Sequence, residues 1–205
     1  MSLEIRAFIY GGDDTRCQVV LRKDIPEQAQ NNFAMLDGWA QKSVIAIGVD
    51  LKHTQRWTCE ECGKPARETW FDPRPSLRVS SPVVVLPIHH LCEAGGGACH
   101  AAVETRVRGT PPAPSVRPSM PDGSPIPLAG SCAKCQRDET AEEGFKMSRC
   151  SKCKLTRYCS AGCQKEDWTR HSRTCKTIQG VQWFNWDEPE PESEDETLKM
   201  PGAFV

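Results

Sequence analysis

Pairs of cysteines separated by two residues are the first chemically informative feature of this sequence. The chain has 205 residues and 12 cysteines, and such pairs occur at Cys59/Cys62, Cys132/Cys135 and Cys150/Cys153. A C-x2-C pair turns the chain so that two thiolates converge on one ion, and structural Zn²⁺ sites are built from four Cys or His donors. The pattern therefore predicts metal ligation.

The second half of the chain has enough donors for two zinc ions. Seven cysteines and one histidine lie between residues 132 and 175. Besides two C-x2-C pairs, they include Cys159/Cys163 and His171/Cys175, which are each spaced i,i+4. Residues four apart share one face of a helix, so we expect each zinc to take one C-x2-C pair and one helical pair. The spacing alone does not decide which pairs combine.

This stretch resembles the MYND zinc-finger family over about 45 residues. The resemblance is carried by the ligand order C-C-C-C-C-C-H-C and by the segments Arg149-Cys-Ser-Lys-Cys-Lys154, Tyr158-Cys-Ser160 and Cys163-Gln-Lys-Glu-Asp-Trp-Thr-Arg-His171. The chain departs from the family in a longer stretch between the first two C-x2-C pairs and in Gln136, where a small residue is common. Full ligation leaves no open coordination position, which favours a structural module over a zinc hydrolase.

The resemblance also implies how the donors are shared, because the two sites of the family interleave. One zinc is assigned to Cys132, Cys135, Cys159 and Cys163, and the other to Cys150, Cys153, His171 and Cys175. Because a ring nitrogen of His171 must be unprotonated to bind zinc, its other N–H is expected to need a nearby acceptor.

The resemblance further implies a peptide-binding surface. Family members bind proline-rich peptides of the P-x-L-x-P kind in a shallow groove lined by a Gln and a Trp, which correspond to Gln164 and Trp168 here. Trp168 also shares a helical stripe with His171, so the indole is equally suited to packing over the zinc site. Both roles stay open for this residue.

A third zinc site is predicted in the amino-terminal region. Cys59 and Cys62 supply two ligands, and Gly63 suits a turn of positive φ in which backbone N–H groups reach the sulfur. The simplest set adds Cys92 and Cys99.

Two alternatives to this third site stay open. In one, His100 or His90 replaces a cysteine as the fourth ligand. In the other, Cys59 and Cys62 form a thiol redox pair, but such a pair normally opens a helix, which Pro65 disfavours. The amino-acid pattern of residues 57–66 also loosely resembles the amino-terminal part of small fungal MYND proteins.

The elements that position these ligands are short and belong to the α+β class. Residues 5–10 and 17–22 are predicted as strands around a turn at 11–14. A helix cap at 24–27 precedes apolar residues at helical spacing, and residues 44–49 are predicted as a further strand. Those helical positions are Ala29, Phe33, Leu36 and Ala40.

Composition divides the chain into four regions. Residues 1–105 form the α+β region, 106–131 a proline-rich, extended and solvated linker, 132–175 the finger, and 187–205 an acidic tail that is expected to be disordered. Hydrophobic residues make up 38% of the chain and aromatics 7%. Because so little apolar material limits the core, zinc is expected to stabilise these small domains.

Charge is distributed unevenly. Residues 134–176 carry 11 Lys and Arg against 6 Asp and Glu, whereas 177–205 carry 1 against 7. One interpretation of these opposite charges is that the finger attracts the tail. The other, which is the more common role of charged segments, is that each surface is simply solvated. For the segment 181–186, docking on a partner and folding back on the finger both stay open, and neither is favoured. An overall pI of 6.5 disfavours a nucleic-acid-associated zinc protein, which stays as an alternative.

The sequence as a whole predicts an intracellular protein. It shows no secretory signal and no apolar run near the roughly 20 residues that cross a bilayer, so we expect the cytoplasm, the nucleus or both, where clustered cysteines favour metal over disulfides. We expect no enzyme activity, Zn²⁺ as the cofactor, no membrane, and partners with proline-containing motifs of a regulatory or transcriptional kind.

Overall fold

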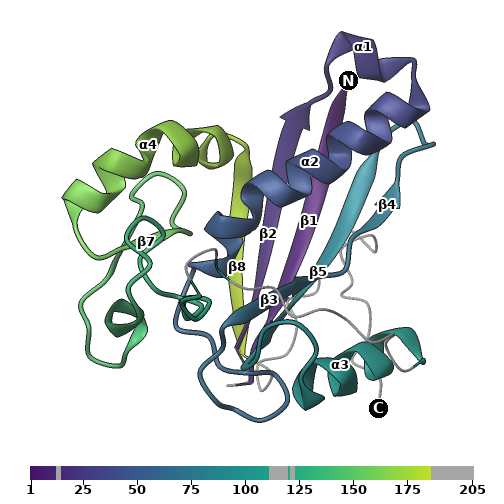
Figure 1. Ribbon diagram of the computed structural model, residues 1–205. Helices are drawn as coiled ribbons and strands as arrows, with labels where there is room; N and C mark the ends of the chain where they lie inside the picture. The colour runs from purple at the N-terminus through teal and green to yellow at the C-terminus, as the bar shows by residue number, and fades with distance from the viewer. Residues whose placement is uncertain (13–14, 111–119, 121–122, 186–205) are drawn as a thin grey trace.

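Residues 1–12, 15–110, 120 and 123–185 are described by the computed structural model of the protein. Within these ranges, one six-stranded sheet has the strand order β3-β5-β1-β2-β8, and β4 pairs with β5 beside that path (Figure 1). β1 and β5 are parallel, and the other pairs are antiparallel. The strands are β1 (Ser2–Tyr10), β2 (Thr15–Asp24), β3 (Glu68–Phe71), β4 (Arg74–Ser76), β5 (Val83–Leu91) and β8 (Ile178–Asn185).

The hairpin of β1 and β2 confirms the two strands that the sequence predicts. Alternate residues of β1 are fully buried, which is the period-2 pattern of a strand with one face on the core. Ile9 pairs with Cys17, whose side chain is also fully buried. The buried residues of β1 are Leu3, Ile5, Ala7 and Ile9.

A 20-residue helix, α2 (Phe33–Lys52), covers one face of the sheet (Figure 1) and follows the short α1 (Glu27–Gln30). The Asn32 side chain accepts a hydrogen bond from the Met35 N–H and caps the helix. The prediction of a strand at 44–49 is wrong, because the apolar residues continue the helical period. The buried positions are Leu36, Ala40, Val44, Ile47 and Leu51.

The segment predicted as a solvated linker, 106–131, is ordered at both ends. Its first residues belong to α3 (Ala98–Arg108), and 111–119 lie outside the described residues. At the other end the Ala129 N–H donates to the Ala66 carbonyl at 2.7 Å, and Gly130 donates to Lys52. A Cβ at Gly130 would lie 1.9 Å from the Gln55 carbonyl oxygen, so this close approach to the residues that follow α2 requires glycine. The expectation of a solvated linker is therefore corrected at these ends.

The finger packs against the sheet region instead of standing apart from it. It contains the 3-10 turn η1 (Asp138–Ala141), the hairpin of β6 (Ser148–Arg149) and β7 (Arg157–Tyr158), and the helix α4 (Ala161–Cys175). Leu155 and Tyr158 belong to the same apolar cluster as Leu51 of α2. The finger and the α+β region therefore share one core.

After the finger, β8 returns to the sheet and pairs with β2. Residues 181–185 pair with β2, as Val181 does with Val19, and the Trp183 ring also lies 4.8 Å from the Arg149 guanidinium of the finger, so this segment contacts both the sheet and the finger. Docking of 181–186 on a partner stays a prediction, and residue 186 lies outside the described residues. The predicted acidic tail, 187–205, lies outside the described residues.

Candidate metal centres and peptide surface

Three groups of four donor atoms converge in the structure, and they coincide with the sets expected from the sequence. Within each group the ligand atoms all lie within 4.8 Å of one another. The groups are Cys59, Cys62, Cys92 and Cys99; Cys132, Cys135, Cys159 and Cys163; and Cys150, Cys153, His171 and Cys175.

The spacing of the sulfur atoms fits tetrahedral zinc. Thiolates about 2.3 Å from one ion lie about 3.8 Å apart at the corners of a tetrahedron. The Sγ atoms are 3.6 Å apart for Cys62/Cys92, 3.8 Å for Cys135/Cys159 and 3.9 Å for Cys150/Cys175. A disulfide needs about 2.05 Å, and all these cysteines are free. The donor sets therefore suit Zn²⁺, which chemically prefers four thiolate or imidazole ligands.

The three C-x2-C pairs adopt the same type of turn. In each, the residue after the second cysteine donates its N–H to the carbonyl of the first cysteine at 2.9 Å. That residue is left-handed in all three turns, with φ of 71° at Gly63, 54° at Gln136 and 58° at Lys154. Gln136 therefore takes the conformation that glycine adopts easily, and the departure from the family pattern leaves the turn unchanged.

The helix α4 supplies three of the eight ligands of the finger. The Ser160 side chain accepts a hydrogen bond from the Cys163 N–H at 3.2 Å and caps the helix. Cys159 precedes this cap, so the expectation that Cys159 and Cys163 form a pair within one helix is corrected. His171 and Cys175 do form such a pair in the last turns of α4.

The acceptor that His171 requires comes from outside the finger. The ring is fully buried, and its Nδ1 lies 2.8 Å from Oδ1 of Asp50 on α2. Its Nε2 lies 3.7 Å from the Cys153 Sγ. Donation from Nδ1–H to Asp50 fixes the tautomer in which the Nε2 lone pair faces the metal position. Asp50 therefore orients a zinc ligand.

A small ionic network holds Asp50 itself. Arg170 donates to both Asp50 carboxylate oxygens, at 2.9 and 3.0 Å, and also pairs with Asp167. The Thr156 hydroxyl donates to Asp50, and Tyr158 donates to Asp167. Burial alone would raise the pKa of Asp50, but hydrogen bonds from His171 and Arg170 outweigh it and hold this pKa below its usual value. The carboxylate is thus ionised beside the zinc site.

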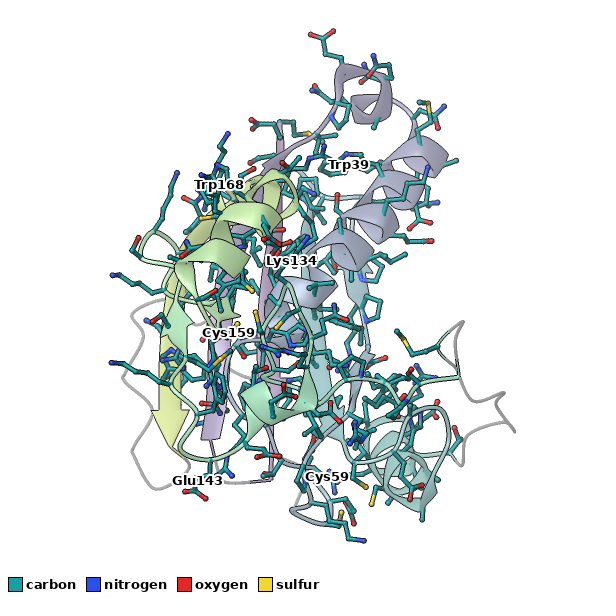
Figure 2. The ribbon with its side chains drawn as sticks, turned by 60° about the vertical axis from the view of Figure 1, so that its left-hand side comes forward. Trp39, Cys59, Lys134, Glu143, Cys159 and Trp168 are labelled. Atoms are coloured by element: carbon teal, nitrogen blue, oxygen red, sulfur yellow. The ribbon has the colours of Figure 1, made fainter. Side chains whose placement is uncertain are left out.

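The amino-terminal site is built where three segments meet. Cys59 and Cys62 come from the turn before β3, Cys92 follows β5, and Cys99 lies in the first turn of α3. Cys59 is buried, Cys62 is exposed, and Cys92 and Cys99 are half-buried. Figure 2 shows Cys59 at the lower end of the molecule, well below Cys159 of the finger. This site therefore faces solvent on one side.

The neighbouring histidines have other partners, and the alternatives that make them ligands are wrong. His90 is fully buried and stacks on Trp57 with ring centroids 4.8 Å apart. The His100 ring faces Glu68 through Nδ1 and Glu104 through Nε2, at 3.1 and 3.3 Å. Neither ring joins the four-cysteine group. The thiols of Cys59 and Cys62 lie in one group with those of Cys92 and Cys99, which is the arrangement expected of four zinc ligands and not of a two-cysteine redox pair.

The two residues expected to bind peptide lie on the outer part of α4. Trp168 is 42% exposed, and its ring centroid lies 6.0 Å from that of His171. Gln164 is half-buried one turn earlier. Figure 2 shows Trp168 on α4 beside α2, which carries Trp39. The indole thus covers the zinc-site histidine with one part and presents another part to solvent.

Comparison with known proteins gives the finger a family. The MYND finger family matches residues 132–175, which confirms the resemblance found in the sequence. This segment is a MYND zinc finger, and its zinc-binding character agrees with the donor groups. No solved structure matches the chain significantly. Among the described residues, no helix is long and apolar enough to cross a membrane.

Several curated proteins are similar over the same short stretch. SET domain and MYND-type zinc finger protein 6 of Schizosaccharomyces pombe is 44% identical over 52 residues, 25% of this chain and 10% of that protein. Histone-lysine N-methyltransferase SMYD3 of Homo sapiens is 50% identical over 56 residues, 25% of this chain and 13% of that protein. Tudor domain-containing protein 1 of Mus musculus is 51% identical over 35 residues, 17% of this chain and 3% of that protein. The chain thus spans about a tenth or less of most of these relatives.

Proposed function

We propose that this protein is a non-catalytic adaptor whose finger binds proline-containing segments of regulatory or transcriptional proteins. The observation that carries the proposal is the 42% exposed indole of Trp168 on the zinc-stabilised helix α4. A large aromatic side chain that a rigid element holds half in solvent is a suitable platform for a proline ring.

The closed metal sites support the non-catalytic part of the proposal. Each donor group supplies four protein ligands, which leaves no position for an activated water. The same geometry argues against a redox role for Cys59 and Cys62, because their thiolates are engaged as ligands. The methyltransferase name belongs to a relative, SMYD3, that this chain matches over the finger alone.

The polar neighbour of Trp168 supplies directionality. Gln164 precedes it by one helical turn, so the amide and the indole lie on the same side of α4. An amide both donates and accepts hydrogen bonds, and a proline-rich segment offers free carbonyl groups because its proline nitrogens carry no hydrogen. Gln164 would therefore hold the peptide backbone while Trp168 contacts a proline ring. We also propose that the protein acts inside the cell, where its many free thiols stay reduced.

The test compares two aromatic residues of the finger. The zinc-loaded full chain, Trp168→Ala and the control Phe145→Ala, whose side chain is 40% exposed, are titrated with a labelled P-x-L-x-P peptide and with its alanine-substituted version. Zinc content is measured first for each variant. We expect Trp168→Ala to weaken binding of the proline peptide about tenfold or more, as for an aromatic hot spot, and Phe145→Ala to leave it unchanged. Equal affinities for both peptides, or for both variants, would contradict the proposal.

A further inference from the structure

Two arginines of the finger face each other in an arrangement that is unfavourable by itself. Arg149 of β6 and Arg157 of β7 are direct cross-strand partners in the two-stranded hairpin. Like charges that stand directly opposite in an antiparallel pair destabilise it. An anion placed between them would turn this repulsion into attraction.

The described part of the chain does not supply that anion. No ion pair among the described residues engages Arg149 or Arg157, although the nearby Arg56 pairs with Glu143 at 3.5 Å. The three guanidinium groups affect one another, because burial, then Arg149 and Arg56, lower the pKa of Arg157. Arg149 is exposed, so its charge is available at the surface.

Strand β8 brings an aromatic ring to the same place. The Arg149 guanidinium lies 4.8 Å from the centroid of the Trp183 ring, which is a cation–π distance. The Trp183 ring also stacks on the ring of Trp57, with the two ring centroids 6.1 Å apart, and this contact fixes its position. The arrowhead of β8 and Glu143 lie toward the same lower end of the molecule in Figure 2. The cationic patch of Arg56, Arg149 and Arg157 is therefore next to the point where β8 ends.

The chain that follows β8 has the complementary charge. Seven of the ten residues from 187 to 196 are acidic. Residue 187 is four positions beyond Trp183, so the first acids are within roughly 14 Å of chain from the ring that Arg149 covers. A segment tethered this closely has an effective concentration in the millimolar range at the patch.

We propose that the acidic segment 187–196 docks on the cationic patch and places its carboxylates at Arg149 and Arg157. The pairing relieves the cross-strand repulsion and covers the basic face of the finger. External polyanions such as nucleic acid are then excluded from this face by the chain itself. Because the contacts lie at the surface, docking weakens as salt shortens the Debye length from about 10 Å at 0.1 M.

The experiment uses the zinc-loaded full chain and a protease that cleaves after glutamate. Cleavage within 187–196 is timed for the unmodified protein, for the double variant Arg149→Gln/Arg157→Gln, and for the control Arg78→Gln, whose guanidinium lies over Phe33 elsewhere. We expect the double variant to be cleaved about three times faster at low salt, from the loss of one exposed and one half-buried ion pair. At 0.5 M salt all three should be cleaved at the same rate.

A second variant leaves the folded part untouched. Replacing Glu188, Glu190, Glu192 and Glu194 by Gln should shift the NMR Nε–Hε signals of Arg149 and Arg157 but not that of Arg78. Equal cleavage rates at low salt, or unshifted arginine signals in this variant, would overturn the proposal. It would also be overturned if heparin moved the Arg149 and Arg157 signals equally in the unmodified protein and in the Gln variant, because the patch would then be open to external polyanions.

Discussion

The two ends of the molecule hold zinc ligands in opposite environments. In the finger, all of Cys150, Cys153, His171 and Cys175 are buried. In the amino-terminal site only Cys59 is buried, and Cys62 is exposed. The first group has its histidine anchored by Asp50 of a distant helix, whereas the second joins loops at one end of the sheet.

This difference in burial indicates how much of the fold would be destabilised by the loss of each zinc. Cys150, Cys153 and Cys175 belong to the large apolar cluster that also contains Leu51 of α2. Cys59 belongs to a small cluster with Leu91 and Val103. Zinc in the finger is therefore coupled to the common core, and zinc at the amino-terminal site is coupled mainly to a local turn and to α3.

The largest expected effect is the loss of a buried ligand. Cys175→Ser should remove one zinc and abolish cooperative unfolding of the finger, because binding of a structural zinc contributes on the order of 10 kcal/mol. Cys62→Ser should also remove one zinc but leave the remaining transition nearly intact. Zinc content by atomic spectroscopy and thermal unfolding by circular dichroism measure both. If Cys62→Ser unfolds the protein as completely as Cys175→Ser, the contrast between the sites is wrong.

The second effect tests the anchor across the interface. Asp50→Asn removes the charge that Arg170 and His171 contact, but Arg170 keeps its ion pair with Asp167, so we expect a loss of about 1–3 kcal/mol in the free energy of unfolding. The zinc affinity of the site should fall about 10–100-fold, because His171 loses its orienting partner. Chelator competition and denaturant unfolding measure the two changes. Asp37→Asn, on the same helix beside Gln41, is the control and should change neither.

The smallest effect is a dependence of stability on pH. Burial and the neighbouring Lys52 lower the pKa of His53 to about 3, and burial also lowers the pKa of His90. In the unfolded chain both histidines become protonated as pH falls through about 6.5, whereas in the folded chain they stay neutral. The free energy of unfolding therefore falls as pH decreases. Each histidine should cost about 0.8 kcal/mol between pH 7.5 and pH 6.

Urea unfolding at both pH values, with zinc content checked at each, measures this loss. His53→Gln should remove about half of it. An unchanged difference between the two pH values in His53→Gln would show that His53 is not the group responsible.

Spacing and periodicity predict much of the site and part of the fold. The turn at each C-x2-C pair is local, so residues such as Cys59 and Cys62 could be assigned from sequence alone. The hairpin of β1 and β2 follows from alternation. The interleaving of the finger ligands, in contrast, came from the family resemblance and not from the spacing.

Features that depend on distant contacts could not be predicted. Residues 44–49 are rich in β-branched side chains that favour strands, but Val44, Ile47 and Leu51 continue the buried face of α2, and packing outweighs local propensity. The need of His171 for an acceptor was predictable from zinc chemistry. Its partner Asp50 was not, because 121 residues separate the two in sequence.

The return of β8 to the sheet has a consequence for the order of folding. Val19 of β2 pairs with Val181, so this edge of the sheet stays incomplete until the whole finger has been synthesised. At about 5–20 residues per second, the ribosome leaves β2 without this neighbour for about 8–30 seconds. Pairing between such distant residues is intrinsically slow to form. All the ligands of the finger precede β8 in the chain, so the finger can bind zinc before the sheet closes, and a finger that stays unfolded without metal would leave the edge of β2 exposed to other chains.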